Sequence, residues 1–199
     1  MKKIILSAAA LFAFGFANAQ DATNAGGKGF ANGDIFISGA VGINSESTGD
    51  IKENAFTIAP SVGFFVSDNI AVGGRIGYTS LKSEEPGVDD ITESELAIGA
   101  FGRYYATPAS DFSLFAELGV EYASAKVEQG PAELTVNGFG VALAPGISYF
   151  VGSNWAIEAS IAALSYSSVK PDVDGAEATN NFGLNVDFSN IRFGVVYKF

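Results

Sequence analysis

The stretch from residue 112 to residue 123 reads FSLFAELGVEYA and decides the fold. Alternate residues fall into two sets. The first set is apolar: Phe112, Leu114, Ala116, Leu118, Val120 and Tyr122. The second set is mixed: Ser113, Phe115, Glu117, Gly119, Glu121 and Ala123. Because successive side chains of a strand point to opposite faces, this period of two predicts a strand with one apolar face and one more polar face.

The same period recurs along the chain between polar turns. It predicts eight strands, over residues 34–44, 55–66, 69–80, 94–106, 112–125, 134–151, 155–167 and 183–199. The connections at 67–69, 107–111 and 152–154 are short, and the others are long and polar. Short turns at one rim and long loops at the other, with an even strand count, are typical of transmembrane barrels. We therefore predict an all-β fold, an eight-stranded antiparallel up-and-down transmembrane β-barrel.

The predicted long loops hold most of the acidic residues. These are Glu46, Asp50, Glu53, Glu84, Glu85, Asp89, Asp90, Glu93, Glu128, Glu133, Asp172, Asp174 and Glu177. Only 17% of the chain is charged, below the ~25% usual for soluble domains. The net charge is −11, and −13 once two lysines leave with the segment described next, which argues against binding to nucleic acid or to an anionic surface through bulk electrostatics. The acidic loops predict contact with host, matrix or neighbouring proteins.

The N-terminus has the pattern of a secretory signal peptide. Lys2 and Lys3 precede an apolar stretch over residues 4–16 and the small-residue tripeptide at 17–19. We predict a signal peptide over residues 1–19, because the apolar stretch is shorter than the ~20 residues of a spanning helix. Residues 20–33 show no pattern, so we expect a flexible periplasmic leader, followed by the barrel domain over residues 34–199.

The more polar face carries charges of both signs. They are Arg75, Glu95, Arg103, Glu117, Glu121, Glu158, Arg192 and Lys198. An eight-stranded barrel is just wide enough inside to be filled by side chains, and ions paired there avoid the cost of contact with lipid. We therefore predict a lumen charge network and outer-membrane lipid against the apolar face. The opposite orientation describes a soluble lipocalin-like barrel around an apolar ligand. The few charges and many small residues of the polar face argue against it.

An internal repeat supports the division into hairpins. Residues 58–77, IAPSVGFFVSDNIAVGGRIG, align without gaps on residues 143–162, LAPGISYFVGSNWAIEASIA. Each copy has a proline, Pro60 or Pro145, inside a strand-like run, which predicts a bulge or local unpairing there because proline cannot donate to a ladder. The alternation also slips after Glu158, so a bulge is expected near Ala162.

Aromatic residues gather near the predicted strand ends. They are Phe64, Phe65, Tyr78, Tyr104, Tyr105, Phe112, Tyr122, Tyr149, Phe150, Trp155, Tyr166, Phe193, Tyr197 and Phe199. We expect them to form the aromatic girdles of a transmembrane barrel, the alternative being ordinary core packing.

The last eight residues, RFGVVYKF at 192–199, carry a resemblance. Together with APSVGFFV, FGRYYA and LAPGISYFV, they make the chain similar to the small outer-membrane β-barrel family, which includes OmpA/OmpX-type barrels and porin-like proteins. The resemblance implies the outer membrane of a Gram-negative bacterium as the location. It also implies insertion by the barrel assembly machinery, with Arg192, Gly194, Tyr197 and Phe199 as the assembly signal.

The chain contains no His and no Cys, which removes the Ser-His-Asp, Cys-His and His-containing zinc arrangements. Glu117 and Glu121 lie four residues apart on one face, ~13 Å at 3.3 Å per residue, farther apart than the carboxylates of glycosidases. We therefore expect no enzyme, no catalytic or metal residues and no cofactor. The leading hypothesis is a structural or surface-interaction barrel. A narrow small-solute channel and, less favoured, a membrane enzyme stay open.

Overall fold

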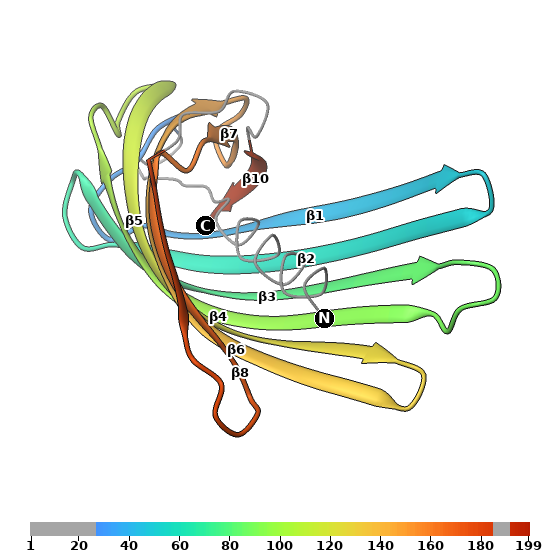
Figure 1. Cartoon of the computed structure of the whole chain (residues 1–199). Helices are drawn as coiled ribbons and strands as arrows, with labels where there is room; N and C mark the ends of the chain where they lie inside the picture. Colours follow the sequence, from blue (N-terminus) through green and yellow to red (C-terminus); the bar gives the residue numbers. More distant parts are fainter. Residues whose placement is uncertain (1–26, 185–191) are drawn as a thin grey trace.

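The computed structural model describes residues 27–184 and 192–199. Its strands are β1 (Ile35–Thr48), β2 (Ile51–Phe65), β3 (Ile70–Glu84), β4 (Ile91–Tyr105), β5 (Phe112–Gln129), β6 (Ala132–Phe150), β7 (Trp155–Ser160), β8 (Leu164–Pro171), β9 (Thr179–Leu184) and β10 (Arg192–Lys198). All pairings between them are antiparallel (Figure 1). Within the described residues, no helix has the length and apolar character to cross a membrane. The predicted signal peptide lies outside the described residues.

The sheet closes on itself. Strands β1 to β6 pair in chain order, β6 pairs with β7, β7 with β10, and β10 with β1. The part of β6 from Val136 to Leu143 pairs with β8, which pairs in turn with β9. β7 and β8 are thus two halves of the seventh barrel strand, and β9 and β10 are the described parts of the eighth. The predicted eight-stranded up-and-down barrel is confirmed.

The proline and bulge predictions are confirmed by the register. β2 and β3 pair from Ile58 with Tyr78 and again from Ser61 with Arg75, so the ladder skips Pro60 without changing register. At Pro145 the register does change. Gly146 pairs with Ser160 and Leu143 with Leu164, which leaves two residues of β6 opposite three residues between β7 and β8. This bulge restores Leu164 to the outward face.

The repeated segments form the same turn twice, at the end of the barrel that carries the short connections. This end is called the lower end, and the opposite end the upper end. In the first turn, Asn69 Nδ2 donates to the carbonyl of Tyr105 at 2.7 Å, and the Tyr105 N–H donates back to the Asn69 carbonyl at 2.8 Å. In the second, Asn154 Nδ2 and the Lys198 N–H make the same reciprocal pair, each at 2.9 Å. The identical asparagines of the repeat therefore clamp each hairpin to the end of a neighbouring strand.

The upper connections differ from the prediction of long loops. β1 and β2 are joined by Gly49 and Asp50 alone, and β5 and β6 by Gly130 and Pro131 alone. The strands run on through residues expected in loops, because each strand supplies a partner ladder for its neighbour far beyond the apolar segment. β5 and β6 have 18 and 19 residues, well over the ~9–11 that span a bilayer. The upper halves of these strands therefore project as long hairpins, which point to the right in Figure 1.

The outside of the barrel carries an apolar band. On β5 it runs from Phe112 to Tyr122 and on β6 from Tyr149 up to Phe139, with the alternate residues buried inside. Most of the predicted girdle residues are exposed on this outer face, at its upper or lower edge. This orientation, apolar side outward, is the one that a hydrocarbon solvent requires.

The band makes a position-specific prediction. Leu118 lies at its middle on β5, whereas Ser124 lies on the same outward face above it. We expect Leu118→Arg to lower the free energy of unfolding by about 2–4 kcal/mol and Ser124→Arg by about 0–1 kcal/mol, because the cost of a cation falls toward the interface. Denaturant titration of the barrel in lipid vesicles measures both. Equal costs at the two positions would contradict the placement of the band.

Candidate functional site: the filled lumen

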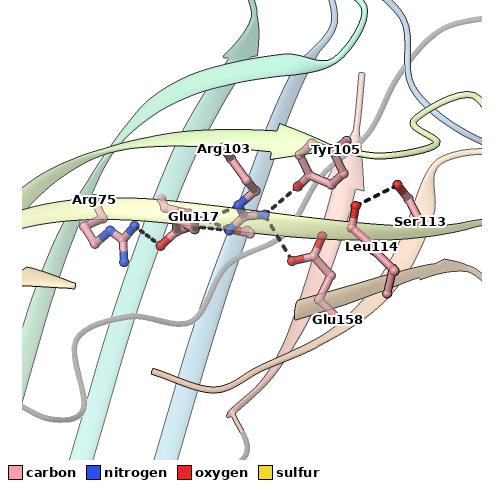
Figure 2. A network of polar contacts seen from close by, with 9 residues as sticks. Arg75, Arg103, Tyr105, Ser113, Leu114, Glu117 and Glu158 are labelled. Atoms are coloured by element: carbon pink, nitrogen blue, oxygen red, sulfur yellow. Dashed lines mark hydrogen bonds and ion pairs between the residues drawn. The ribbon is translucent and has the colours of Figure 1, made fainter. Parts of the chain in front are cut away.

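A buried ionic network crosses the lower half of the lumen. Arg103 on β4 donates through Nε to Glu117 on β5 at 2.9 Å and through Nη1 to Glu158 on β7 at 3.1 Å, and its Nη2 also contacts Glu117. Arg75 on β3 donates to the second oxygen of Glu117 at 2.6 Å. Figure 2 shows Arg103 between the two glutamates. The Arg103 side chain has no exposed surface, so the network ties four strands together inside the barrel.

Aromatic rings surround the guanidinium groups. The Arg103 group lies 4.4 Å from the ring centroid of Phe115 and 5.4 Å from that of Phe101, and Arg75 lies 4.8 Å from Phe101. Arg103 also donates to the Tyr105 hydroxyl at 2.7 Å. A cation over the face of a ring is stabilised by the ring quadrupole, more strongly when water is absent. The network is therefore enclosed as well as paired.

Inward-facing glycines make room for these rings. A Cβ on Gly63 would lie 1.8 Å from the ring of Phe36, one on Gly73 2.3 Å from Phe101, and one on Gly146 2.3 Å from Phe115. Each phenylalanine thus fills the space that a glycine leaves on another strand. The high glycine content of the polar face is explained by this interdigitation, since the interior of a narrow barrel alternates small and large side chains.

A second layer closes the lower mouth, and it includes part of the predicted leader. Phe30 is 2% exposed and lies 4.7 Å from Phe65, 4.9 Å from Tyr105 and 5.2 Å from Phe150, between ring centroids. Its N–H donates to the carbonyl of Pro108 at 2.6 Å. Residues 27–33 therefore depart from the predicted flexible leader, because an aromatic anchor holds them in the mouth. Residues 20–26 lie outside the described residues.

This layer corrects part of the girdle prediction. Phe65, Tyr105 and Phe150 are buried inside the lumen and do not face the membrane. Each follows an outward-facing aromatic neighbour, so the two adjacent rings point to opposite faces of the strand. Clustering near strand ends could not separate these faces, whereas strict alternation within each strand would have done so.

Of the other predicted lumen residues, Glu121 and Arg192 interact electrostatically with Arg75 and Glu117 of the network. Glu95 and Glu121 are buried in the upper half of the barrel, among alanines of β4 and β5. Arg192 begins β10 and is half-buried, opposite Ser160. Lys198 is buried at the lower mouth, where Nζ donates to the carbonyls of Gly27 and Gly29 at 3.3 and 3.1 Å. The structure thus joins Arg75, Arg103, Glu117 and Glu158 by hydrogen bonds and uses Lys198 to hold the N-terminal segment.

The predicted assembly-signal residues are spread over both faces of β10. Tyr197 packs against Trp155 of β7 at 4.9 Å and against Phe199 at 5.2 Å between ring centroids. Gly194 lies on the buried face directly opposite Glu158, next to Arg192 in the alternation. The aromatic members of the motif therefore belong to the lower girdle and the other two to the lumen wall.

Two contributors to the site were absent from the sequence prediction: Tyr105 and Phe30. Tyr105 shares the inward phase of Arg103 on β4, so alternation alone could have placed it beside the network. Phe30 precedes the first strand and has no periodic signal. Only the folded chain shows that it reaches the aromatic layer.

The arrangement suits a plug better than a reaction centre. Both oxygens of Glu117 are engaged by arginines, and Glu158 is held by Arg103. Glu117 therefore has no oxygen free for a proton or a substrate, and the two arginines and two glutamates neutralise one another. The ionic layer and the aromatic layer both lie across the lower half of the lumen.

Comparisons with known proteins agree with this architecture. A profile of the "Outer membrane protein beta-barrel domain" family matches residues 6–199. Among solved structures, the chain is similar to the outer membrane protein OprG from Pseudomonas aeruginosa, with 14% identity, a TM-score of 0.54, and 86% of this chain and 98% of that chain covered. It is also similar to Neisserial surface protein A, with 19% identity, a TM-score of 0.52, and 85% and 99% covered. None of the curated proteins compared with the chain matches it.

A closed antiparallel barrel with an apolar exterior and a filled interior defines an integral membrane β-barrel protein. The family match over nearly the whole length is more specific: the chain belongs to the outer-membrane protein β-barrel family. This membership indicates the outer membrane as its location.

The ionic layer predicts a large effect of one residue on stability. We expect Arg103→Ala to lower the free energy of unfolding in lipid vesicles by about 3–5 kcal/mol, because it leaves two glutamates buried without their shared cation. Denaturant titration measures this change. The control is Lys28→Ala, which removes the solvent-exposed pair with Asp111 and should leave the free energy of unfolding nearly unchanged. A tolerated Arg103→Ala would show that the network does not carry the lumen's stability.

Proposed function

We propose that this protein is a non-conducting outer-membrane barrel with a structural and surface-interaction role. The observation that carries the proposal is the pair of layers across the lumen, one ionic around Arg103 and one aromatic around Phe30. Both are buried, and the aromatic layer is anchored by Lys198 and Pro108. A small-solute channel would need a hydrated path through both layers, so the channel hypothesis is less well supported.

The upper hairpins are the parts that would contact other molecules. They extend beyond the apolar band and end in acidic residues, including Asp50, Asp90 and Glu133. In transmembrane barrels the longer connections face the exterior of the cell. Rigid hairpins present these carboxylates at lower entropic cost than flexible loops, which favours contact with cationic groups of host, matrix or neighbouring proteins.

An enzymatic role receives no support from the lumen. The chain contains no His or Cys, and the network carboxylates Glu117 and Glu158 are already bound by arginines. We therefore propose that the protein is not an enzyme and needs no cofactor.

Export and insertion complete the proposal. The N-terminal pattern supports removal of a signal peptide in a Gram-negative cell. The aromatic residues of β10 fit recognition by the barrel assembly machinery, and β10 is the strand that pairs with β1 to close the barrel.

Conductance tests the closed lumen. We expect the refolded wild-type chain to produce no ion-current steps in planar bilayers, because both layers exclude water. The triple variant Phe30→Ala, Arg103→Ala, Glu117→Ala should conduct, since it removes a member of each layer. The matched control replaces outward-facing Phe64, Leu114 and Leu118 by Ala and should stay silent. Steady conductance of the wild-type barrel would overturn the proposal.

Hairpin truncation tests the separation of folding from contact. Removal of residues 86–89, the tip between β3 and β4, should leave heat-dependent mobility on detergent gels unchanged, because these residues lie outside every strand. The truncated barrel should bind cationic polymer beads more weakly than the intact barrel, because Asp89 is removed. A truncated chain that fails to form the compact barrel would show that the tip belongs to the folding unit.

A further inference from the structure

The outward face above the apolar band is stratified by chemistry. The highest apolar residues on the outward face of β1 to β6 and β8 are Ile43, Phe56, Tyr78, Leu96, Tyr122, Phe139 and Tyr166. Two residues farther up, every position is Ser or Asn: Ser45, Asn54, Ser80, Ser94, Ser124, Asn137 and Ser168. Because the side-chain period of a strand is two, these positions share the outward face with the band below them.

The next two levels carry charges of opposite sign. Four residues above the band the positions are Ser47, Lys52, Lys82, Thr92, Lys126, Thr135 and Lys170. Six residues above it, on strands β2 to β6 and β8 or their turns, all are acidic: Asp50, Glu84, Asp90, Glu128, Glu133 and Asp172. We call Lys52, Lys82, Lys126 and Lys170 the lysine row, and the six acids the acidic row. The lysine row thus lies between the membrane and the acidic row.

We propose that the lysine row is a docking site for phosphate-bearing lipid headgroups of the outer leaflet. The inference is independent of whether the lumen conducts. It starts from the distribution of cations: of the described lysines and arginines, all except Lys28 and the row face the lumen. Lys28 lies at the lower end, where it pairs with Asp111. Among the described strand residues, cations on the outer face therefore occur only above the apolar band.

The height of the row matches the headgroup region. Four residues correspond to ~13 Å along a strand, or ~10 Å along the membrane normal at the usual tilt of about 40°. The polar layer on each side of the hydrocarbon is ~5–8 Å thick. A lysine side chain can extend back toward the membrane by several ångströms, so its ammonium group reaches the phosphate level.

The ammonium groups have donors left for a ligand. Lys82 contacts Glu84 at 2.5 Å and Asp90 at 2.8 Å, and Lys126 contacts Glu128 at 2.8 Å and Glu133 at 3.0 Å. Each lysine has three N–H donors, so two carboxylates leave one free. These side chains remain 44% and 41% exposed. Among the described residues, no carboxylate oxygen lies within 4.0 Å of the ammonium nitrogen of Lys52 or Lys170.

The carboxylates also keep the row charged. Hydrogen bonds from Asp90 and Glu84 raise the pKa of Lys82, and those from Glu128 and Glu133 raise the pKa of Lys126. Both hairpins lie above the membrane-spanning band. The two ammonium groups therefore stay protonated throughout the physiological pH range.

The order of the two rows selects a lipid over other anions. An acidic protein or a nucleic acid arriving from water would meet the acidic row first, and like charges repel it. A phosphate already in the leaflet approaches from below and meets the lysines first. Charge complementarity thus favours a ligand that is part of the membrane.

Lipid retention by the full mature barrel tests the proposal. The barrel in neutral detergent micelles is mixed with phosphatidylglycerol or phosphatidylcholine, and bound lipid is counted by native mass spectrometry. We expect at least about tenfold preference for phosphatidylglycerol at low salt, weakening as salt rises. Replacement of all four row lysines by Gln should abolish the preference, whereas Glu84→Gln with Glu128→Gln should increase it.

Single variants provide the matched control. Lys170→Gln should weaken phosphatidylglycerol retention several-fold, and Lys28→Gln at the opposite end should not change it. Heat-dependent mobility verifies that each variant is folded. The proposal is overturned if the four-lysine variant keeps the wild-type preference, if Lys28→Gln has the same effect as Lys170→Gln, or if inorganic phosphate alone displaces the lipid.

Discussion

Hydrocarbon cannot form hydrogen bonds with peptide groups, and this constraint governs the whole molecule. It requires a sheet without free edges at membrane depth, which the pairing of β10 with both β1 and β7 provides. Closure in turn creates an interior that must be filled. The outer face needs apolar residues to meet lipid, so charge and bulk that a soluble protein would place outside are found within.

The filling of that interior follows from the small diameter of an eight-stranded barrel. Rings and glycines interdigitate, as Phe36 with Gly63 and Phe115 with Gly146 show. Arginines and glutamates are tolerated there only when they pair with one another, because an unpaired buried charge costs several kcal/mol. The result is a lumen whose lower half is filled by packed side chains and by charges that neutralise one another.

Above the membrane the same strands are surrounded by water instead of hydrocarbon. The ladder continues because backbone pairing does not depend on what the side chains face, but the outward composition changes from apolar to Ser and Asn, then to lysine, then to acid. This succession follows the dielectric profile from hydrocarbon through headgroups to water. A single secondary-structure element therefore carries the membrane anchor, the lipid-facing collar and the surface tip.

The sequence by itself determined the strand period, the two faces, the proline interruptions and the bulge near Ala162, because alternation and proline chemistry are local. It did not determine where the strands end, since Glu93 and Glu128 extend their strands through pairing with neighbours and not through their own polarity. Only the tertiary structure joined Arg103 to Glu158, 55 residues away, and placed Phe30 in the lower mouth. Contacts across a lumen depend on closure and stagger of the whole sheet, which no single segment encodes.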